Sequence, residues 1–137
     1  MNGETPEHRS RVMRAVRSRD TTPEMIVRRA ATALGYRYRL YKAELPGKPD
    51  LVFGPRRKVV FVHGCFWHGH DCLRGARTPK TNVDYWRAKI SRNVARDREN
   101  VATLERAGWR VLTIWECGTR NSQRATLAET IGTFLAS

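Results

Sequence analysis

A stretch of twelve residues, FVHGCFWHGHDC at positions 61–72, concentrates the side chains best suited to bind a metal or to move protons. It holds two of the three cysteines of the chain and three of its four histidines. Thiolate and imidazole are preferred ligands of Zn²⁺, and imidazole also changes its protonation state near neutral pH. The stretch therefore predicts both a metal site and acid–base chemistry within one loop.

Three cysteines and one histidine complete the tetrahedral ligand set of a structural zinc ion. Two of these cysteines lie within the loop, while the third ends an apolar strand much later in the chain. A zinc ion would therefore fasten the loop to that strand. The spacing is not that of a standard zinc finger, and buried thiols without a metal are the alternative interpretation. The predicted ligands are Cys65, His70, Cys72 and Cys117.

Two histidines of the loop are left over if zinc binds only one. His63 follows the apolar run KVVFV, so its side chain can project from the end of a sheet. His68 lies among the expected metal ligands. Both are candidates for general acid–base catalysis, and structural histidines are the alternative.

Three carboxylates stand where such chemistry could use them. Asp50 follows the turn sequence LPGKP and opens an apolar strand, where it could bind Mg²⁺ or serve only as a turn residue. Asp97 lies on the apolar stripe of a long helix, where an unpaired charge is costly, so a histidine or metal partner is expected. Glu24 lies at a helix start, where it can simply complement the helix dipole.

Aromatic residues interrupt the same loop. Phe66 and Trp67 stand between an expected zinc ligand and His68, where they cannot easily reach the main core. Exposed aromatic side chains on a basic protein can stack on bases or wedge between them. Trp86, on the long helix, is a third candidate, with a core position as its alternative.

The charge balance predicts a polyanionic partner. The chain of 137 residues carries 26 Lys and Arg against 13 Asp and Glu, a formal net charge of +13. A field of this size attracts phosphate backbones, so nucleic acid is the expected partner. No apolar run approaches the roughly 20 residues of a membrane span, and no secretory signal is expected. Three cysteines suit a reducing cytoplasm better than a disulfide framework.

The elements that must position these residues alternate between helices and strands. Thr22 is the expected N-cap of a helix at 22–34, with Pro23 as its first residue. Three neighbouring strands followed by a helical crossover predict one α/β domain with a mixed sheet flanked by helices. The strand at 109–117 is expected to be central, because it is apolar on both faces. The other predicted elements are a basic helix or arm at 5–20, strands at 36–41, 50–53 and 58–63, a long helix at 83–107 and a last helix around 127–135.

Five segments of the chain resemble, in order and spacing, the bacterial very short patch repair (Vsr) DNA mismatch endonuclease family. They are SRVMRAVRSRDTTPE, LPGKPDLVF, FVHGCFWHGHDC, YWRAKISRNVARDR and GWRVLTIWEC, and together they cover about residues 8 to 120. The resemblance implies the restriction-endonuclease-like PD-(D/E)XK fold. It also implies a basic N-terminal arm at 1–20 that grips DNA, followed by an endonuclease domain at 21–137.

The family resemblance further implies an activity and its partners. Members of the family nick duplex DNA 5′ of the T in a T:G mismatch left by deamination of 5-methylcytosine, in a Mg²⁺-dependent reaction. The expected substrate is therefore mismatched double-stranded DNA. A cytosine-5 methyltransferase and repair proteins are the expected functional partners of a monomer in the bacterial cytoplasm, associated with the nucleoid.

The same resemblance implies a role for each candidate residue. Asp50 and the backbone carbonyl of Val62 would bind Mg²⁺, while His68 would act as the general base. His63 would assist at the phosphate, and Glu24 and Asp97 would orient or tune the histidines. Zinc would take the four ligands already named, and Phe66, Trp67 and Trp86 would form the wedge beside the mismatch. Further DNA contacts are expected from Arg14, Arg17, Arg19, Lys48, Lys89 and Asn93.

The chain departs from the family pattern at several positions. Val62 replaces the usual Thr, and Gly69 and Asp71 stand in a metal loop that is richer in histidine elsewhere in the family. The (D/E)XK pair of ordinary restriction enzymes is absent, with Val62 and His63 in its place, as is typical of the family. Two alternatives therefore stay open: a restriction-like or defence nuclease with another DNA substrate, and a non-catalytic, zinc-stabilised DNA-binding protein.

Overall fold

The computed structural model of the chain describes residues 21–40, 44–72 and 81–137. The predicted arm at 1–20, with Arg14, Arg17 and Arg19, lies outside these residues. The helices are α2 (Thr22–Ala33), α3 (Val83–Arg106) and α4 (Arg124–Ala136), and the strands are β1 (Arg39–Leu40), β2 (Leu51–Phe53), β3 (Lys58–His63) and β4 (Arg110–Trp115). Short 3-10 helices lie at Gly54–Arg56, Glu116–Thr119 and Asn121–Gln123.

The four strands form one mixed sheet in the order β1-β2-β3-β4. β1, β2 and β3 are successively antiparallel, whereas β4 returns parallel to β3 after the long helix α3. The parallel register pairs His63, the last residue of β3, with Trp115, the last residue of β4. This topology confirms the predicted mixed sheet with its helical crossover.

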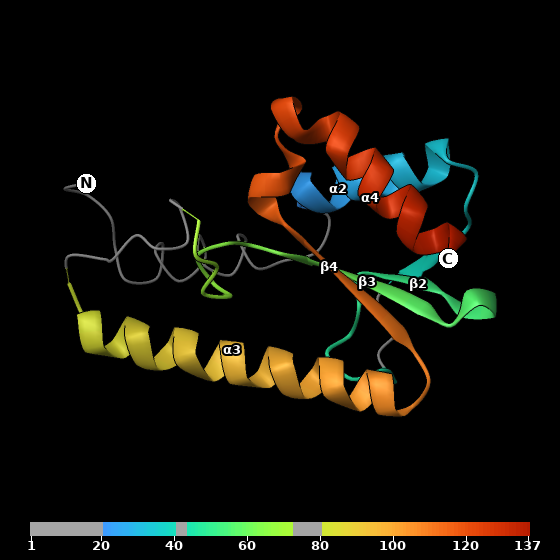
Figure 1. Cartoon of the computed structure of the whole chain (residues 1–137). Coiled ribbons are helices and arrows are strands. Elements are labelled where there is room, and N and C mark those ends of the chain that lie inside the picture. The colour runs from blue at the N-terminus through green and yellow to red at the C-terminus, as the bar shows by residue number, and fades with distance from the viewer. Residues whose placement is uncertain (1–20, 41–43, 73–80) are drawn as a thin grey trace.

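Helices cover both faces of the sheet, as Figure 1 shows, with α2 and α4 on one side and α3 on the other. Alternation along β3 supplies both cores, because successive side chains of a strand point to opposite faces. Val60 packs in the core beneath α2 and α4, while Val59 and Phe61 pack in the core beneath α3. β3 is therefore buried on both faces, which explains its unbroken apolar sequence.

β4 is the last strand of the described sheet and not a central one, so that prediction was wrong. Ile114 faces the α2–α4 core while Val111 packs against the α3 core. β4 is apolar on both faces because helices cover both faces, and not because it has a neighbouring strand on each side. β4 also ends at Trp115, so Cys117 lies in the 3-10 helix that follows the strand.

Two other boundaries differ from the predictions. The N-cap of α2 is Thr21 and not Thr22, and its side chain accepts a hydrogen bond from the backbone N–H of Glu24 at 3.5 Å. Thr22 occupies the first helical position instead. Among the described residues of the predicted strand 36–41, only Arg39 and Leu40 pair with β2. Tyr36 and Tyr38 contact the core edge-to-face through Phe53. None of the described helices is long and apolar enough to cross a membrane.

Candidate active site and metal centre

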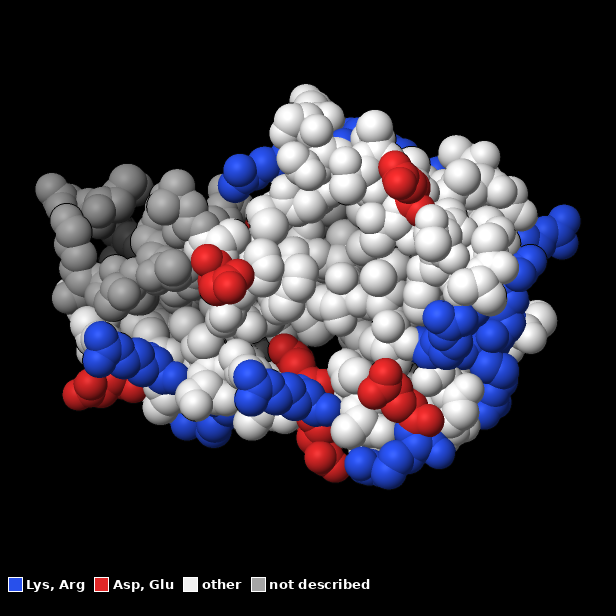
Figure 2. All heavy atoms as spheres, in the orientation of Figure 1, with Lys and Arg blue, Asp and Glu red and all other residues white. Residues whose placement is uncertain are grey.

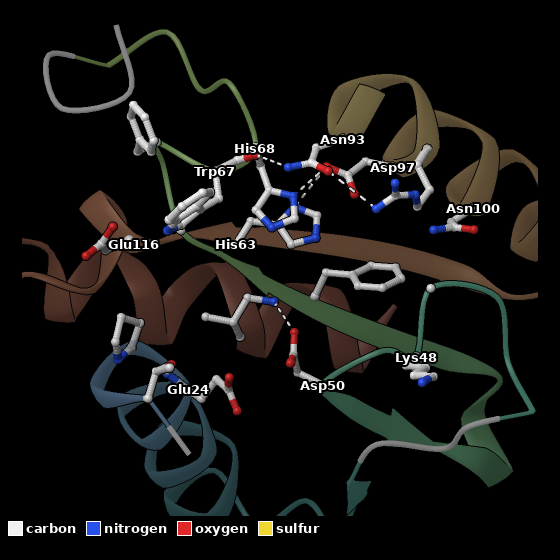
Figure 3. Close-up of a pocket in the computed structure, with 18 of the residues that line it drawn as sticks. Glu24, Lys48, Asp50, His63, Trp67, His68, Asn93, Asp97, Asn100 and Glu116 are labelled. Carbon is white, nitrogen blue, oxygen red and sulfur yellow. Dashed lines mark hydrogen bonds and ion pairs between the residues drawn. The ribbon is translucent and has the colours of Figure 1, made fainter. Parts of the chain in front are cut away.

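One end of the sheet gathers the chemically useful residues. The strand directions place the start of β2 beside the ends of β3 and β4, so the segments that join the strands there are neighbours. A cavity of about 580 Å³ lies at this end. Figure 3 shows Glu24 and Asp50 on its α2 side and His63, His68 and Asp97 on its α3 side. The fold therefore brings all five predicted catalytic residues to one cavity.

Asp50 lies one residue before β2, and its side chain accepts a backbone hydrogen bond from β3 just beyond the end of the β2–β3 pairing. Its Oδ2 accepts a hydrogen bond from the backbone N–H of Val62 at 2.6 Å. Continuing the ladder by two residues would place Pro49 opposite Val62, and Pro49 has no N–H to offer the Val62 carbonyl. Since the N–H and C=O of one strand residue point to the same side, that carbonyl faces the Asp50 side of β3.

The surroundings of Asp50 oppose its negative charge. Burial raises the pKa of Asp50 from 3.8 to about 7 and outweighs the hydrogen bond from Val62, which lowers it. Glu24 adds to the rise, because its own carboxylate is a nearby like charge. Glu24 is buried and forms an ion pair with Arg28 at 3.2 Å. A bound cation would relieve the cost of charge at Asp50, and the oxygen donors present fit Mg²⁺.

Two stacked histidines share one carboxylate on the opposite side of the cavity. Nδ1 of His68 lies 2.6 Å from Oδ2 of Asp97, a short hydrogen bond. The ring of His63 stacks on that of His68 with centroids 3.8 Å apart and planes inclined by 4°. A proton on Nδ1 of His68 satisfies Asp97 and leaves Nε2 as the proton acceptor. Asp97 thus has the histidine partner that its place on an apolar stripe predicted.

His63 is held in its neutral form. Its side chain is only 10% exposed, and burial lowers its pKa from 6.5 to about 4. The neighbouring His68 lowers it further, and Asp97 only partly opposes this. A neutral imidazole can hydrogen-bond or bind a metal without bringing charge into the site.

The four predicted zinc ligands form one cluster, in which one donor atom of each residue lies within 4.8 Å of the others. Cys65 is fully buried, and Sγ of Cys117 lies 3.7 Å from Nδ1 of His70. Burial raises the pKa of the Cys65 thiol to about 12, so a thiolate here needs a cation to neutralise it. The cluster could hold a metal ion, and three thiols with one imidazole fit zinc.

The predicted wedge residues pack on one another and lie outside both core clusters. Phe66, Trp67 and Trp86 form edge contacts with centroids 5.2 to 5.8 Å apart. Nζ of Lys89 lies 5.7 Å from the centre of the Trp67 ring. Asn93 is buried, and its side-chain N–H donates to the Trp67 carbonyl at 2.8 Å. Asn93 therefore holds the loop that carries Trp67 against α3, whereas direct contact of Asn93 with DNA stays a prediction.

Gly69 explains one departure from the family pattern. Its backbone has a φ of +65°, and a Cβ atom there would lie 2.8 Å from Val94 and 3.0 Å from Ile90 on α3. The loop therefore approaches α3 more closely than a residue with a side chain would allow. Asp71, another departure from the family pattern, is fully exposed, with a carboxylate oxygen 3.8 Å from Nε2 of His70.

Sequence reasoning missed two residues, the last residue of β4 and the one that follows it. Trp115 stacks on His70 with ring centroids 4.2 Å apart and also touches the edge of His63 at 5.4 Å. Glu116 lines the cavity and accepts a hydrogen bond from the backbone N–H of Cys65 at 3.4 Å. Their position directly before Cys117 was the available signal, because a zinc site at Cys117 also brings its neighbours to the loop.

Positive side chains extend well beyond the cavity. Figure 2 shows Lys and Arg along α3 and at the sheet end that carries the β2–β3 turn, with Asp and Glu interspersed along α3. The exposed arginines of α3 are Arg87, Arg92, Arg96, Arg98 and Arg106. Lys48, at the cavity rim, has a left-handed backbone with a φ of 49°.

Comparison with known proteins identifies the family of the chain. Residues 1–74 match the family model described as DNA mismatch endonuclease Vsr. The chain is also 43% identical over 118 residues to the DNA mismatch endonuclease Vsr of Escherichia coli K12, covering 86% of this chain and 75% of the relative. The chain belongs to the Vsr family. It is therefore a DNA endonuclease by family.

Other relatives carry a nicking activity in their names. The chain is 51% identical over 113 residues to the type II nicking enzyme V.XorIIP of Xanthomonas oryzae pv. oryzae, covering 82% of each protein. It is 44% identical over 117 residues to the type II nicking enzyme V.NmeAIP of Neisseria meningitidis, covering 85% of this chain and 83% of the relative.

Proposed function

We propose that this protein nicks duplex DNA 5′ of the T in a T:G mismatch, by Mg²⁺-dependent hydrolysis of a phosphodiester. The observation that carries the proposal is one cavity with a half-buried carboxylate, Asp50, on one side and the His68–Asp97 pair on the other. A metal-binding group and a proton acceptor facing one space are what in-line hydrolysis requires. We also assign the fold to the restriction-endonuclease-like PD-(D/E)XK class, on the strength of its mixed sheet between helices and its family.

Asp50 and the backbone carbonyl of Val62 would hold Mg²⁺. The bound ion would stabilise the negative charge that develops on the phosphate. Val in place of Thr at position 62 is harmless under this assignment, because the backbone supplies the ligand. The carboxylate of Glu24 would add negative charge beside Asp50. This charge would favour the binding of a cation there, because two neighbouring carboxylates without a cation repel each other.

His68 would act as the general base. Its Nε2 would accept a proton from the attacking water as the oxygen bonds to phosphorus and the bond to the leaving sugar oxygen breaks. Asp97 would stabilise the imidazolium that forms, because its carboxylate already accepts the Nδ1–H. His63, neutral and stacked on His68, would donate a hydrogen bond to the phosphate.

The aromatic cluster would select the mismatch. Inserting Phe66, Trp67 and Trp86 beside a base step costs a few kcal/mol of unstacking, and the cost is least where pairing is already weak. A zinc ion on Cys65, His70, Cys72 and Cys117 would hold the loop that carries two of these aromatics. Lys48, Lys89, Asn93 and the arm at 1–20 would add DNA contacts.

The substrate implies the setting of the reaction. T:G mismatches arise where a cytosine-5 methyltransferase has provided 5-methylcytosine for deamination, so such an enzyme is the proposed functional partner, together with downstream repair proteins. We place the protein, as a monomer, in the cytoplasm with the chromosome.

A labelled duplex with one T:G pair in several flanking contexts tests the proposal. We expect a nick 5′ of the T with Mg²⁺, and none with a matched T:A duplex or with Asp50→Ala. Equal cutting of the matched duplex would replace the repair function with that of a restriction-like or defence nuclease. Tight binding without a nick in any context would favour the non-catalytic DNA-binding protein.

A further inference from the structure

The cluster of His63, His68 and Asp97 has the composition of a second metal site. Each residue offers one ligand atom, and these atoms lie within 4.8 Å of one another. We propose that this cluster binds a transition-metal ion such as Zn²⁺ and that its occupation switches the endonuclease off. The inhibitory part rests on the proposed role of His68 as the general base, whereas the binding part does not.

The distances within the cluster suit a small ion. Both Nδ1 atoms lie near the same Oδ2 of Asp97, that of His68 at 2.6 Å and that of His63 at 4.0 Å. Tetrahedral Zn²⁺ with bonds of about 2.0 to 2.1 Å separates its ligand atoms by about 3.3 Å. For the three atoms to share one ion, each of these two distances would have to change by about 0.7 Å. One of the two stacked rings would also have to turn, so that the in-plane lone pairs of both Nδ1 atoms point at the ion.

His63 carries an unsatisfied nitrogen at this place. Its Nδ1 is buried and has no hydrogen-bond partner within the described part of the chain. A buried polar atom left unpaired costs free energy, and a metal ion bound there would satisfy it. His68 and Asp97 satisfy each other through their hydrogen bond, whereas Nδ1 of His63 has no such partner among the described residues. This unpaired nitrogen is the independent sign of a missing ligand.

An ion can reach the cluster without passing through the proposed Mg²⁺ site. His63, His68 and Asp97 also line a second cavity of about 550 Å³ on the side of Trp115 and Glu105. The cluster therefore separates two cavities, one with Asp50 and one without it. A metal ion in the second cavity can therefore reach the histidines without contacting Asp50.

The ligand types select the ion. Two imidazoles and one carboxylate favour Zn²⁺, Co²⁺ or Ni²⁺ over Mg²⁺, which prefers oxygen donors. Asp50 and the Val62 carbonyl supply only oxygen. The two sites should therefore bind different metals, with Mg²⁺ at Asp50 and a transition metal at the histidine cluster.

Occupation of the cluster would block catalysis through the protons of His68. With Nδ1–H donating to Asp97, Nε2 has a free lone pair and can accept a proton. A metal ion on Nδ1 displaces that proton, and a neutral imidazole must then carry its hydrogen on Nε2. His68 would lose its free lone pair, and Asp97 would bind the metal instead of stabilising an imidazolium.

The binding test uses Co²⁺ added to full-length protein that already holds one equivalent of zinc. We expect one further equivalent to bind, with visible d–d absorption but no thiolate-to-cobalt charge-transfer band, since that band would mark the cysteine cluster. His63→Gln should weaken this binding by more than the roughly 10- to 100-fold lost when an outer-shell partner is removed. Glu105→Gln is the matched control, because Glu105 lines the same cavity and is exposed.

A parallel assay measures nicking in excess Mg²⁺ while Zn²⁺ is added beyond the first equivalent. Loss of nicking at the concentration that fills the second site in wild type supports the proposal. Equal binding of Co²⁺ by wild type and His63→Gln, or no second equivalent at all, overturns it. If the protein binds the second equivalent but nicks no substrate, the metal site stands and the proposed endonuclease mechanism fails. If it nicks and excess Zn²⁺ has no effect, the inhibition is wrong and the endonuclease mechanism stands.

Discussion

Asp97 decides which nitrogen of His68 can act as a base. Its Oδ2 lies 2.6 Å from Nδ1, so the side chain fixes both the tautomer and the ring orientation. Asp97→Asn keeps the size of the side chain, yet its amide can offer an N–H to Nδ1 and favour the wrong tautomer. We expect single-turnover nicking to fall by about 10²- to 10⁴-fold, while affinity for the mismatched duplex stays close to wild type.

The control for this prediction is a double variant. Asp97→Asn combined with His68→Gln should be scarcely slower than His68→Gln alone, because both changes disable one unit. Multiplicative losses in the double variant would show that Asp97 acts independently of His68.

At Asp50, stability conflicts with the proposed function of the residue. Its folded-state pKa of about 7 lies above the unfolded value of 3.8, so the charged carboxylate destabilises the fold. This penalty is absent below about pH 4, grows as the pH rises toward 7 and is complete above it. At about 1.4 kcal/mol per pKa unit, it is on the order of 4 kcal/mol at most.

Asp50→Asn should therefore stabilise the protein while abolishing nicking. The Asn carbonyl can still accept the Val62 N–H, so the change removes the charge with little change of shape. We expect Tm of the zinc-loaded, Mg²⁺-free protein to rise by several degrees at pH 8, and the gain to shrink toward zero by pH 4. A gain that is the same at both pH values would mean that the charge of Asp50 is not its cause.

The loop from β3 to α3 depends on a close approach of backbone to helix. A Cβ at Gly69 would meet Val94 at 2.8 Å and Ile90 at 3.0 Å, whereas a Cβ at Gly35 meets nothing within 4 Å. Both glycines have positive φ, so Gly35→Ala matches the backbone strain of Gly69→Ala without the clash. We expect Gly69→Ala to lose about 1 to 3 kcal/mol more unfolding free energy than Gly35→Ala, by urea denaturation.

The same two glycine variants should also differ in their rate of nicking. The clash at Gly69 displaces the loop that holds His68 and Trp67, so Gly69→Ala should also slow nicking, whereas Gly35→Ala should not. Equal effects of the two variants on stability and on nicking would mean that the loop has room to move.

Element order was predictable from the sequence because apolar periodicity reports which faces are buried. The same signal misplaced β4, since a strand covered by helices on both faces has the pattern of a central strand. Thr21 and Thr22 offer the same hydroxyl, so which of them caps α2 was decided by helix geometry. The role of Trp115 depended on the parallel register that pairs it with His63, which no local pattern encodes.

The candidate site was predictable to the extent that its residues cluster in the sequence. The loop at 61–72 holds expected zinc ligands, histidines and aromatics side by side, so its composition alone predicts a crowded site. Asp97 was recognised because a charge on an apolar stripe needs a partner, and His68 is that partner. Burial of Asn93 against the Trp67 carbonyl was not predictable, because polar residues on helices are usually exposed.

The distribution of charge over the whole molecule should set the salt dependence of DNA binding. A net charge of +13 predicts strong attraction to any duplex, but only side chains that neutralise phosphates release counterions. α3 offers a comparison within one helix. Lys89 lies beside Trp67, a residue of the proposed wedge, whereas Arg106 is the last residue of α3, about 26 Å farther along the axis.

If DNA binds across the cavity and the aromatic cluster, then of these two residues only Lys89 contacts a phosphate and contributes to the salt dependence of binding. Lys89→Gln should reduce the slope of log K against log salt by about 0.9, the change for one lost phosphate contact, and Arg106→Gln should leave it unchanged. Fluorescence anisotropy with a T:G duplex at several salt concentrations measures both slopes. Equal slopes for Lys89→Gln and wild type, or a reduced slope for Arg106→Gln, would place the DNA elsewhere on the protein. Because the slope counts phosphate contacts and not total charge, it separates a docked duplex from general attraction to a basic protein.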